Sequence, residues 1–65
     1  MKPNIDSQWQ HSSGSIYTVY DFSNEKTTQP DRYPVMIHYK DVNGDKWSRP
    51  LSDWHRSMTE LKVSY

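Results

Sequence analysis

Aromatic rings are the main material from which this chain can build a hydrophobic core. Only 32% of its 65 residues are apolar, and these include three tryptophans, five tyrosines and one phenylalanine. Each buried ring removes about 150–250 Å² from water. Domains of this size bury only about 60% of their unfolded surface, so their stability is marginal. We therefore expect one small domain packed around rings, and a homodimer more often than a monomer, because exposed sheet edges can self-pair.

Charge and cysteine usage exclude several classes of protein. The chain has no cysteine, which excludes a disulfide framework and a thiolate metal site. Eight basic and eight acidic residues give a formal net charge of zero, so bulk nucleic acid is disfavoured as a partner. No apolar run approaches the roughly 20 residues of a membrane span, and the first ten residues lack a signal-peptide pattern. We expect a cytoplasmic protein that does not bind membranes.

The residues favour strands over helices. Alanine is absent and leucine occurs twice, whereas β-branched and aromatic residues are frequent. Residues 1–7 are predicted to be a flexible entry segment with nothing to pack, and residues 8–65 a single domain. The polar stretch 24–32 predicts a long loop, and loops of this size are often functional. Strands are predicted over 8–11, 16–23, 33–40, 46–50 and 59–65.

The strand predicted over 16–23 carries aromatic side chains on both faces. Under strict alternation, Tyr17 and Val19 share one face. Tyr20 and Phe22 then share the other. Such a strand is either buried on both sides or borders a binding surface.

The Asn43-Gly44 pair predicts a tight hairpin, for which two registers are possible. A type I′ turn would place Lys40 opposite Trp47, with the indole on the outer surface. A type I turn with Gly44 in a bulge would place Tyr39 opposite Trp47, on the apolar face. A slip of one residue inverts every side chain. We favour the bulged register because so small a core can hardly spare a tryptophan.

A single turn of helix is predicted before the last strand. Pro50 ends the preceding strand, and Ser52 is a plausible N-cap for a turn over residues 53–57. Trp54 and Met58 are four residues apart and can share a face. The resulting order of elements predicts an all-β, SH3-like five-stranded barrel. An OB-like barrel is the runner-up, but it usually needs more residues.

Three spaced motifs carry a family resemblance. They are His11-x-x-Gly14-x-x-Tyr17-x-Val19, Pro34-Val35-x-x-x-Tyr39 and Gly44-x-x-Trp47-x-Arg49-Pro50-Leu51-x-x-Trp54. This pattern resembles a family of small uncharacterised bacterial and bacteriophage proteins on an SH3-like barrel. The resemblance covers about residues 9–58, and residues 49–58 look most like the phage-encoded branch. It implies a fold and, for a phage protein, the host cytoplasm, but no catalytic residue.

Catalytic and metal-binding patterns are weak. The three histidines, His11, His38 and His55, do not have the spacing of a recognised metal motif. The serines do not form a Gly-x-Ser-x-Gly elbow. We predict no catalytic residues, no metal and no cofactor, and hence not an enzyme.

The sequence therefore favours a non-enzymatic interaction module, phage-encoded, that binds a host protein or a component of host defence. The alternative is a protein that sequesters a small nucleotide-type ligand. Nucleic-acid binding and hydrolysis rank lower.

The predicted binding face combines an aromatic anchor with a charged rim. It joins the loop 24–32 and a strand histidine to the segment 49–56, with Trp54 as the anchor. Arg49 either contacts a ligand or pairs with Asp21 or Asp53. The predicted site residues are Arg49, Asp53, Trp54, His55, Arg56, His38, Lys26 and Arg32.

Overall fold

Five strands and one short helix form the part of the chain that the computed structural model describes, residues 2–61. The predicted β-rich chain with one helical turn before its last strand is confirmed. The strands are β1 (Gln8–His11), β2 (Ile16–Ser23), β3 (Met36–Asp41), β4 (Lys46–Pro50) and β5 (Met58–Leu61), and the helix is α1 (Leu51–Ser57). Within these residues, no helix is long and apolar enough to cross a membrane.

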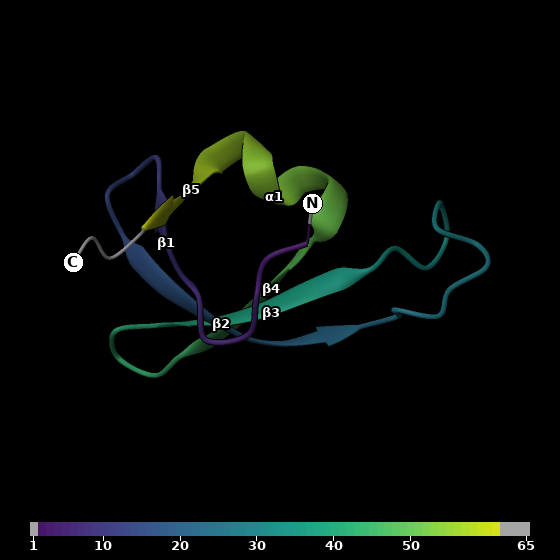
Figure 1. Ribbon diagram of the computed structural model, residues 1–65, viewed down its shortest axis with the longest axis horizontal. Coiled ribbons are helices and arrows are strands. Elements are labelled where there is room, and N and C mark those ends of the chain that lie inside the picture. Colours follow the sequence, from purple (N-terminus) through teal and green to yellow (C-terminus); the bar gives the residue numbers. More distant parts are fainter. Residues whose placement is uncertain (1, 62–65) are drawn as a thin grey trace.

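The strands form one antiparallel sheet in the order β4-β3-β2-β1-β5. β4 and β5 are its two edges, and no ladder joins them within residues 2–61. The sheet is therefore open, and the predicted closed barrel is not formed. The reason is visible in Figure 1, where α1 lies between the two edge strands. The helix packs against β4, β3 and β5 and covers one face of the bent sheet, here called the inner face.

The hairpin between β3 and β4 has the bulged register that the sequence favours. Tyr39 lies opposite Trp47, and the backbone N–H of Gly44 donates to the carbonyl of Asp41 at 3.0 Å. Gly44 has a φ of +85°, in the left-handed region that glycine adopts without a steric penalty. The turn chemistry thus fixes which side chains of β4 reach the inner face.

A β-bulge in β2 overturns the strict alternation expected for this strand. Val19 pairs with Tyr39, but Asp21 pairs with His38, so the register shifts at the residue between them. Phe22 consequently lies opposite Ile37, on the inner face, rather than on the face shared with Tyr20. Bulges insert one extra residue and reverse the facing of those that follow.

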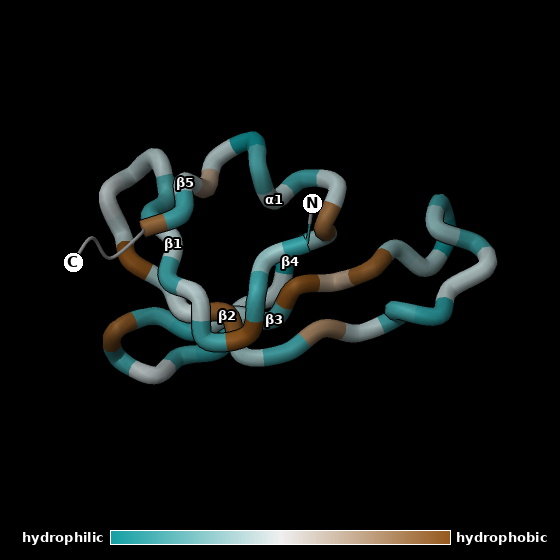
Figure 2. The backbone as a smooth tube through the Cα atoms, viewed as in Figure 1, coloured by the Kyte–Doolittle hydropathy of each residue, from teal (hydrophilic) through white to brown (hydrophobic). Residues whose placement is uncertain are grey.

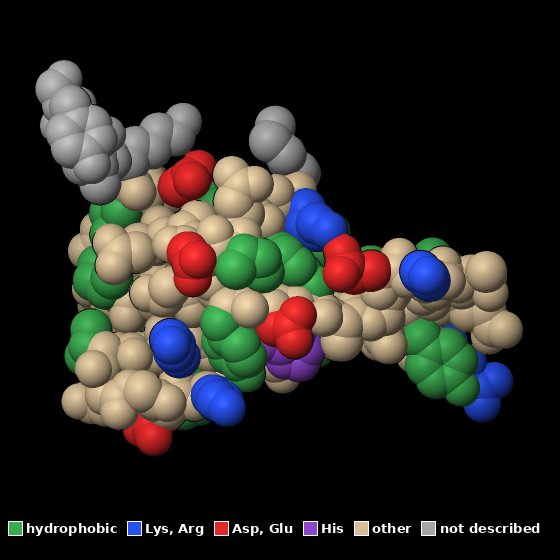
Figure 3. Space-filling model, turned by 60° about the horizontal axis from the view of Figure 1, so that its bottom comes forward, with side chains coloured by type: hydrophobic (Ala, Val, Ile, Leu, Met, Phe, Trp, Pro, Cys, Tyr) green, Lys and Arg blue, Asp and Glu red, His purple; other side chains and the backbone are tan. Residues whose placement is uncertain are grey.

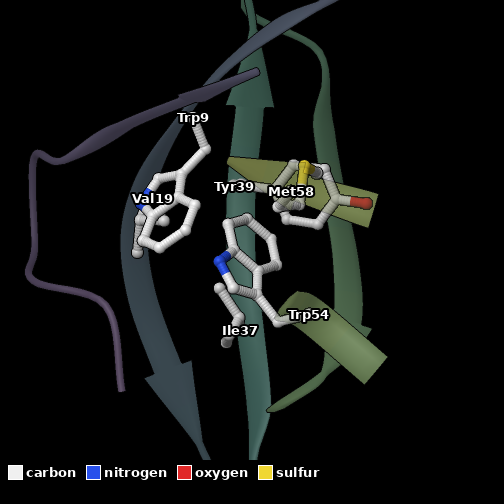
Figure 4. Close-up of a cluster of buried hydrophobic side chains, with 6 residues drawn as sticks. All are labelled: Trp9, Val19, Ile37, Tyr39, Trp54 and Met58. Carbon is white, nitrogen blue, oxygen red and sulfur yellow. The ribbon is translucent and has the colours of Figure 1, made fainter. Parts of the chain in front are cut away.

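The core lies on the inner face and is built largely from rings, as the composition requires (Figure 4). Trp54 projects from α1 and meets Trp9 and Tyr39 edge-to-face, with ring centroids 5.5 and 5.1 Å apart. Such edge-to-face pairs are favourable beyond the area they bury. The buried hydrophobic side chains of the described residues are Trp9, Val19, Ile37, Tyr39, Trp54 and Met58.

Helix α1 begins two residues earlier than predicted. Pro50, not Ser52, is the N-cap, with a φ of −61° and no side-chain capping bond. Proline is pre-set for this φ and has no N–H that would need a partner. The side chains of Trp54 and Met58 are both buried, although Met58 belongs to β5 and not to the helix.

The N-terminal segment is attached to the sheet rather than being without packing contacts. Asp6 N–H donates to the Val19 carbonyl at 2.8 Å, and Val19 N–H donates to the Ser7 carbonyl at 3.0 Å. Pro3 is buried. The Ser7 hydroxyl accepts a hydrogen bond from the Trp9 indole at 2.8 Å. The expected absence of packing contacts is wrong, because backbone groups, the Pro3 ring and the Ser7 hydroxyl all make contacts that depend on how the segment lies across the sheet.

The loop between β2 and β3, residues 24–35, projects from the sheet (Figure 1) and is mostly hydrophilic along its outer part (Figure 2). β3 begins at Met36, three residues later than predicted, and leaves Pro34 in the loop. There the Pro34 carbonyl accepts a hydrogen bond from the Asn24 amide at 2.9 Å. The predicted last strand over 59–65 begins at Met58, and its residues 62–65 lie outside the described part of the chain.

Candidate binding surface

Three of the predicted site residues form an ionic chain where β4 passes into α1. Arg49 Nε lies 3.9 Å from Asp53 Oδ2, and Arg56 Nη2 lies 2.9 Å from Asp53 Oδ1. Asp53 therefore bridges two guanidinium groups. Of the two acidic partners considered for Arg49, the structure selects Asp53, because Asp21 pairs with His38 on the opposite face of the sheet.

Trp54 is not an exposed anchor, contrary to the prediction. Its side chain is fully buried at 0% exposure. The first turns of α1 direct it onto the inner face, where it contacts Trp9 and Tyr39. A core with so few large apolar side chains requires this ring, so it cannot also serve a ligand.

His55 and Arg56 are exposed near the C-terminal end of α1. Together with His11, Ser12 and Gly14 of the β1–β2 turn, they line a cleft of about 430 Å³. A guanidinium near a helix C-terminus stabilises the helix dipole. This accounts for the position of Arg56 without a ligand.

His38 lies on the outer face of the sheet, which is opposite to α1. Its Nε2 is 2.8 Å from the Ser23 hydroxyl, and its ring lies 6.2 Å from that of Tyr20. The predicted grouping of His38 with the segment 49–56 is wrong, because β3 alternates and places Ile37 and Tyr39 inward on either side of it.

Lys26 and Arg32 lie on the projecting loop. Lys26 lines a shallow hollow there, and the Arg32 guanidinium lies 5.6 Å from the centre of the Tyr33 ring. The loop meets the start of α1, where Leu51 N–H donates to the Val35 carbonyl at 2.9 Å and where Pro30 and Pro34 line a hollow with Leu51. The predicted convergence of loop and segment therefore occurs through the backbone and apolar side chains, not through these two charges.

The site residue that the sequence missed is Trp47. It is 53% exposed, whereas Trp9 and Trp54 are 6% and 0% exposed. The register was predicted correctly, but the expected packing of Trp47 in the core is wrong. β4 is an edge strand, and α1 follows its far end at Pro50, away from the hairpin where Trp47 lies. Val42, in the β3–β4 turn, is 83% exposed.

Asp41 fixes the orientation of the Trp47 indole. Its Oδ2 accepts the indole N–H at 3.1 Å, and its Oδ1 accepts backbone N–H groups of Asn43 and Asp45 at 2.9 and 3.1 Å. The bond from Trp47, aided by these turn N–H groups, holds the pKa of Asp41 below its ordinary value, against a smaller opposing effect of desolvation. The carboxylate thus remains an acceptor at neutral pH.

Arg49 completes the surface, two residues from Trp47 on the same face of β4. Its Nη1 is buried and has no hydrogen-bond partner within the described residues. Burial raises the pKa of the Tyr39 phenol, and the nearby Arg49 guanidinium partly offsets this rise. We call the set Trp47, Arg49, Asp53 and Arg56 the Trp47 surface.

Comparison of the chain with protein-family models, curated proteins and solved structures found no match. Within residues 2–61, no group of three histidine or acidic side chains could hold a metal ion. The Trp47 surface is therefore interpreted from its own chemistry, which is that of an aromatic ring beside alternating charges.

Proposed function

We propose that this protein is a non-enzymatic interaction module that binds a partner protein through the Trp47 surface. The observation that carries the proposal is the 53% exposure of Trp47 in a chain whose other two tryptophans form the core. Tryptophan is among the residues most enriched at binding hot spots. A small domain that leaves such a ring outside its core forgoes stability that binding can recover.

The indole is pre-oriented for binding. Its hydrogen bond to Asp41 restricts the ring before any partner arrives. Binding then loses less side-chain entropy than it would with a freely rotating ring. Asp41 is itself held by the turn, so the whole hairpin tip acts as the support.

The ionic chain beside Trp47 defines the chemistry of the partner. Two guanidinium groups flank the single carboxylate of Asp53, which leaves an excess positive charge on this rim. Arginine binds carboxylates in a planar, bidentate geometry. The partner should offer an apolar pocket for the indole and an acidic side chain at the edge of that pocket.

The strand order supports an SH3-like arrangement as part of this proposal. β5 pairs with β1, the remaining strands follow in sequence order, and one short helix precedes β5. Small domains of this architecture commonly bind peptides on aromatic side chains. The resemblance to phage and bacterial proteins makes a bacterial host the source in which to seek the partner.

The test compares three immobilised proteins against one bacterial lysate. Wild type, Trp47→Ala and the matched control Tyr33→Ala are used, because Tyr33 is 51% exposed on the distant loop. We expect a protein that is retained by wild type and the control but lost from Trp47→Ala. A cooperative melting transition well above the temperature of the assay would show that each of the three is folded. Retention by Trp47→Ala would overturn the proposal.

Charge reversals locate the rim independently. Arg56→Glu should weaken capture, whereas Lys26→Glu should not, because Lys26 lies on the projecting loop. Both positions are exposed, so neither change should unfold the protein. A loss of binding with Lys26→Glu alone would place the partner on the loop instead.

A further inference from the structure

Two lysines face each other on the outer face of the sheet, although the hydrophobic core requires neither of them. Lys40 and Lys46 are direct cross-strand partners in the hairpin, and both are exposed. Like charges directly opposite each other destabilise a strand pair. Core packing does not require either residue, since the core and α1 lie on the inner face.

Tyr20 of β2 lies on the same outer face, since it follows the inward-facing Val19. The bulge after it changes the next two residues. Asp21 is turned outward beside Tyr20, and Phe22 is turned inward. Without the bulge, Phe22 would lie outside and the core would lose a ring that packs against it.

Tyr20 and the basic side chains form one cluster. The Lys46 ammonium lies 5.6 Å from the centre of the Tyr20 ring, and the His38 ring lies 6.2 Å from it at an angle of 49°. The Ser23 hydroxyl fixes the position of the His38 ring. We call Tyr20, His38, Lys40 and Lys46 the outer patch.

The outer patch carries an excess of positive charge. Asp21 is the carboxylate that the described strands add to this face, and its Oδ1 accepts the backbone N–H of Phe22 at 2.8 Å. That bond stabilises the bulge. In Figure 3, basic side chains lie beside a hydrophobic one on this face of the molecule, and an acidic side chain lies next to the histidine.

We propose that the outer patch binds a free nucleotide. The base stacks on the ring of Tyr20, with the tilted ring of His38 at its edge, and the phosphate lies between the ammonium groups of Lys40 and Lys46. Stacking on an aromatic ring is favourable for any base. A phosphate bound between the two ammonium groups attracts both of them, and this attraction offsets the repulsion between the opposed lysines.

The size of the patch favours one nucleotide over a nucleic-acid strand. It offers two lysines and one pair of rings, enough for a single base and its phosphate. Affinity for a strand depends on a series of phosphate contacts, and this chain has a net charge of zero. The carboxylate of Asp21, beside His38, would repel the phosphates of an oligonucleotide that extended past His38.

The test is a titration of the ¹⁵N-labelled protein followed by NMR, which detects weak binding. The probes are adenosine monophosphate, adenosine, inorganic phosphate and a single-stranded oligoadenylate. We expect the monophosphate to shift the amide signals of Tyr20, His38, Lys40 and Lys46, and to bind more tightly than adenosine or phosphate alone. Shifts confined to other residues would overturn the proposal. An affinity that rises with oligonucleotide length would also overturn it, since this indicates an extended binding site for single-stranded nucleic acid.

Matched variants distinguish binding at the patch from a general charge effect. Lys40→Glu should lower the affinity for adenosine monophosphate at least about tenfold, as expected for loss of a charge-assisted contact. Lys26→Glu makes the same charge change on the distant loop and should leave the affinity unchanged. Equal weakening by both variants would contradict the proposal. Trp47→Ala should not affect this binding, because Trp47 lies on the inner face, so the two proposed sites can fail separately.

Discussion

The indole of Trp47 and the carboxylate of Asp41 are joined by a hydrogen bond of 3.1 Å beside the β3–β4 turn. The same carboxylate accepts two backbone N–H groups of that turn. One residue therefore couples the conformation of the hairpin tip to the orientation of the most exposed tryptophan. Because Trp47 is 53% exposed and lies outside the buried core, this bond helps to fix its ring.

Acid should release the Trp47 indole only below the ordinary titration range of aspartate. The hydrogen bond lowers the pKa of Asp41 from its usual 3.8. A depressed pKa in the folded state contributes stability that is complete above 3.8 and is lost as the pH falls through the folded value. We expect the indole N–H signal of Trp47 to titrate in NMR spectra with a midpoint below 3.8.

Two comparisons control this experiment. The indole of Trp9 is bonded to the Ser7 hydroxyl, which does not titrate, so its signal should stay constant over the same range. Asp41→Asn retains an acceptor but removes the charge, so the Trp47 signal should lose its pH dependence. A midpoint at or above 3.8 would contradict the assigned role of the bond.

Trp54 and Trp47 should differ sharply in their effect on stability. Trp54→Ala empties the centre of the core and should cost about 3–5 kcal/mol. Trp47→Ala removes a half-exposed ring and one hydrogen bond, and should cost less than about 1.5 kcal/mol. Urea denaturation measures both.

A milder variant keeps this prediction testable if Trp54→Ala does not fold. Trp54→Phe retains a ring and also removes the indole N–H, which is buried without a partner in the described structure. It should therefore cost less than Trp54→Ala but more than Trp47→Ala. Equal losses for the two tryptophan-to-alanine variants would show that Trp47 belongs to the core.

The hairpin shows how far local chemistry can be read from the sequence. Asn43 and Gly44 indicate a tight hairpin but allow two registers. The choice of the bulged register rests on the need of the core for Trp47. The register is confirmed, but that reason is wrong, because Trp47 is 53% exposed. This exposure depends on how far α1 extends over the inner face, which is a long-range property of the fold.

The candidate site was predictable to a similar extent. The grouping of Arg49, Asp53 and Arg56 follows from their spacing of three and four residues and from the helix between them. The burial of Trp54 could not be read from a single helical turn, whose pattern is too short to distinguish its inner from its outer side. Alternation alone places Tyr20 on the face away from Val19, but the outer patch also depends on the pairing of β2 with β3 and of β3 with β4, which brings Tyr20, His38 and Lys46 together and is a long-range property of the fold.

Gly44 should tolerate asparagine better than alanine. No heavy atom lies within 4 Å of the position that a Cβ would take, so the cost comes from the φ of +85° alone. Gly44→Ala should cost about 1–2 kcal/mol, the penalty of a left-handed conformation, and Gly44→Asn less. Thermal denaturation of the two variants measures the difference. An alanine variant as stable as wild type would show that the turn can adopt another register.

The homodimer predicted from the sequence stays a prediction, and the open sheet suggests where it would form. β4 and β5 are the free edges. Lys46 is exposed on β4, and Pro50 has no N–H to donate, and both features oppose strand pairing along this edge. We therefore expect association through β5. Sedimentation equilibrium should show a mass that rises with concentration and that Lys46→Ala does not alter; a constant mass of one chain would contradict dimerisation.

Lys40→Glu should stabilise the fold while it weakens nucleotide binding. The change replaces a repulsive cross-strand pair with an attractive one opposite Lys46. Cross-strand charge pairs contribute roughly 0.2–1 kcal/mol, so the free energy of unfolding should rise by an amount of this order. The cation–π contact between Lys46 and Tyr20 is left in place. Urea denaturation at low and high salt measures the gain, which should shrink as salt screens the pair. A loss of stability would show that Lys40 has a structural role, and the two lysines would then need no ligand to explain them.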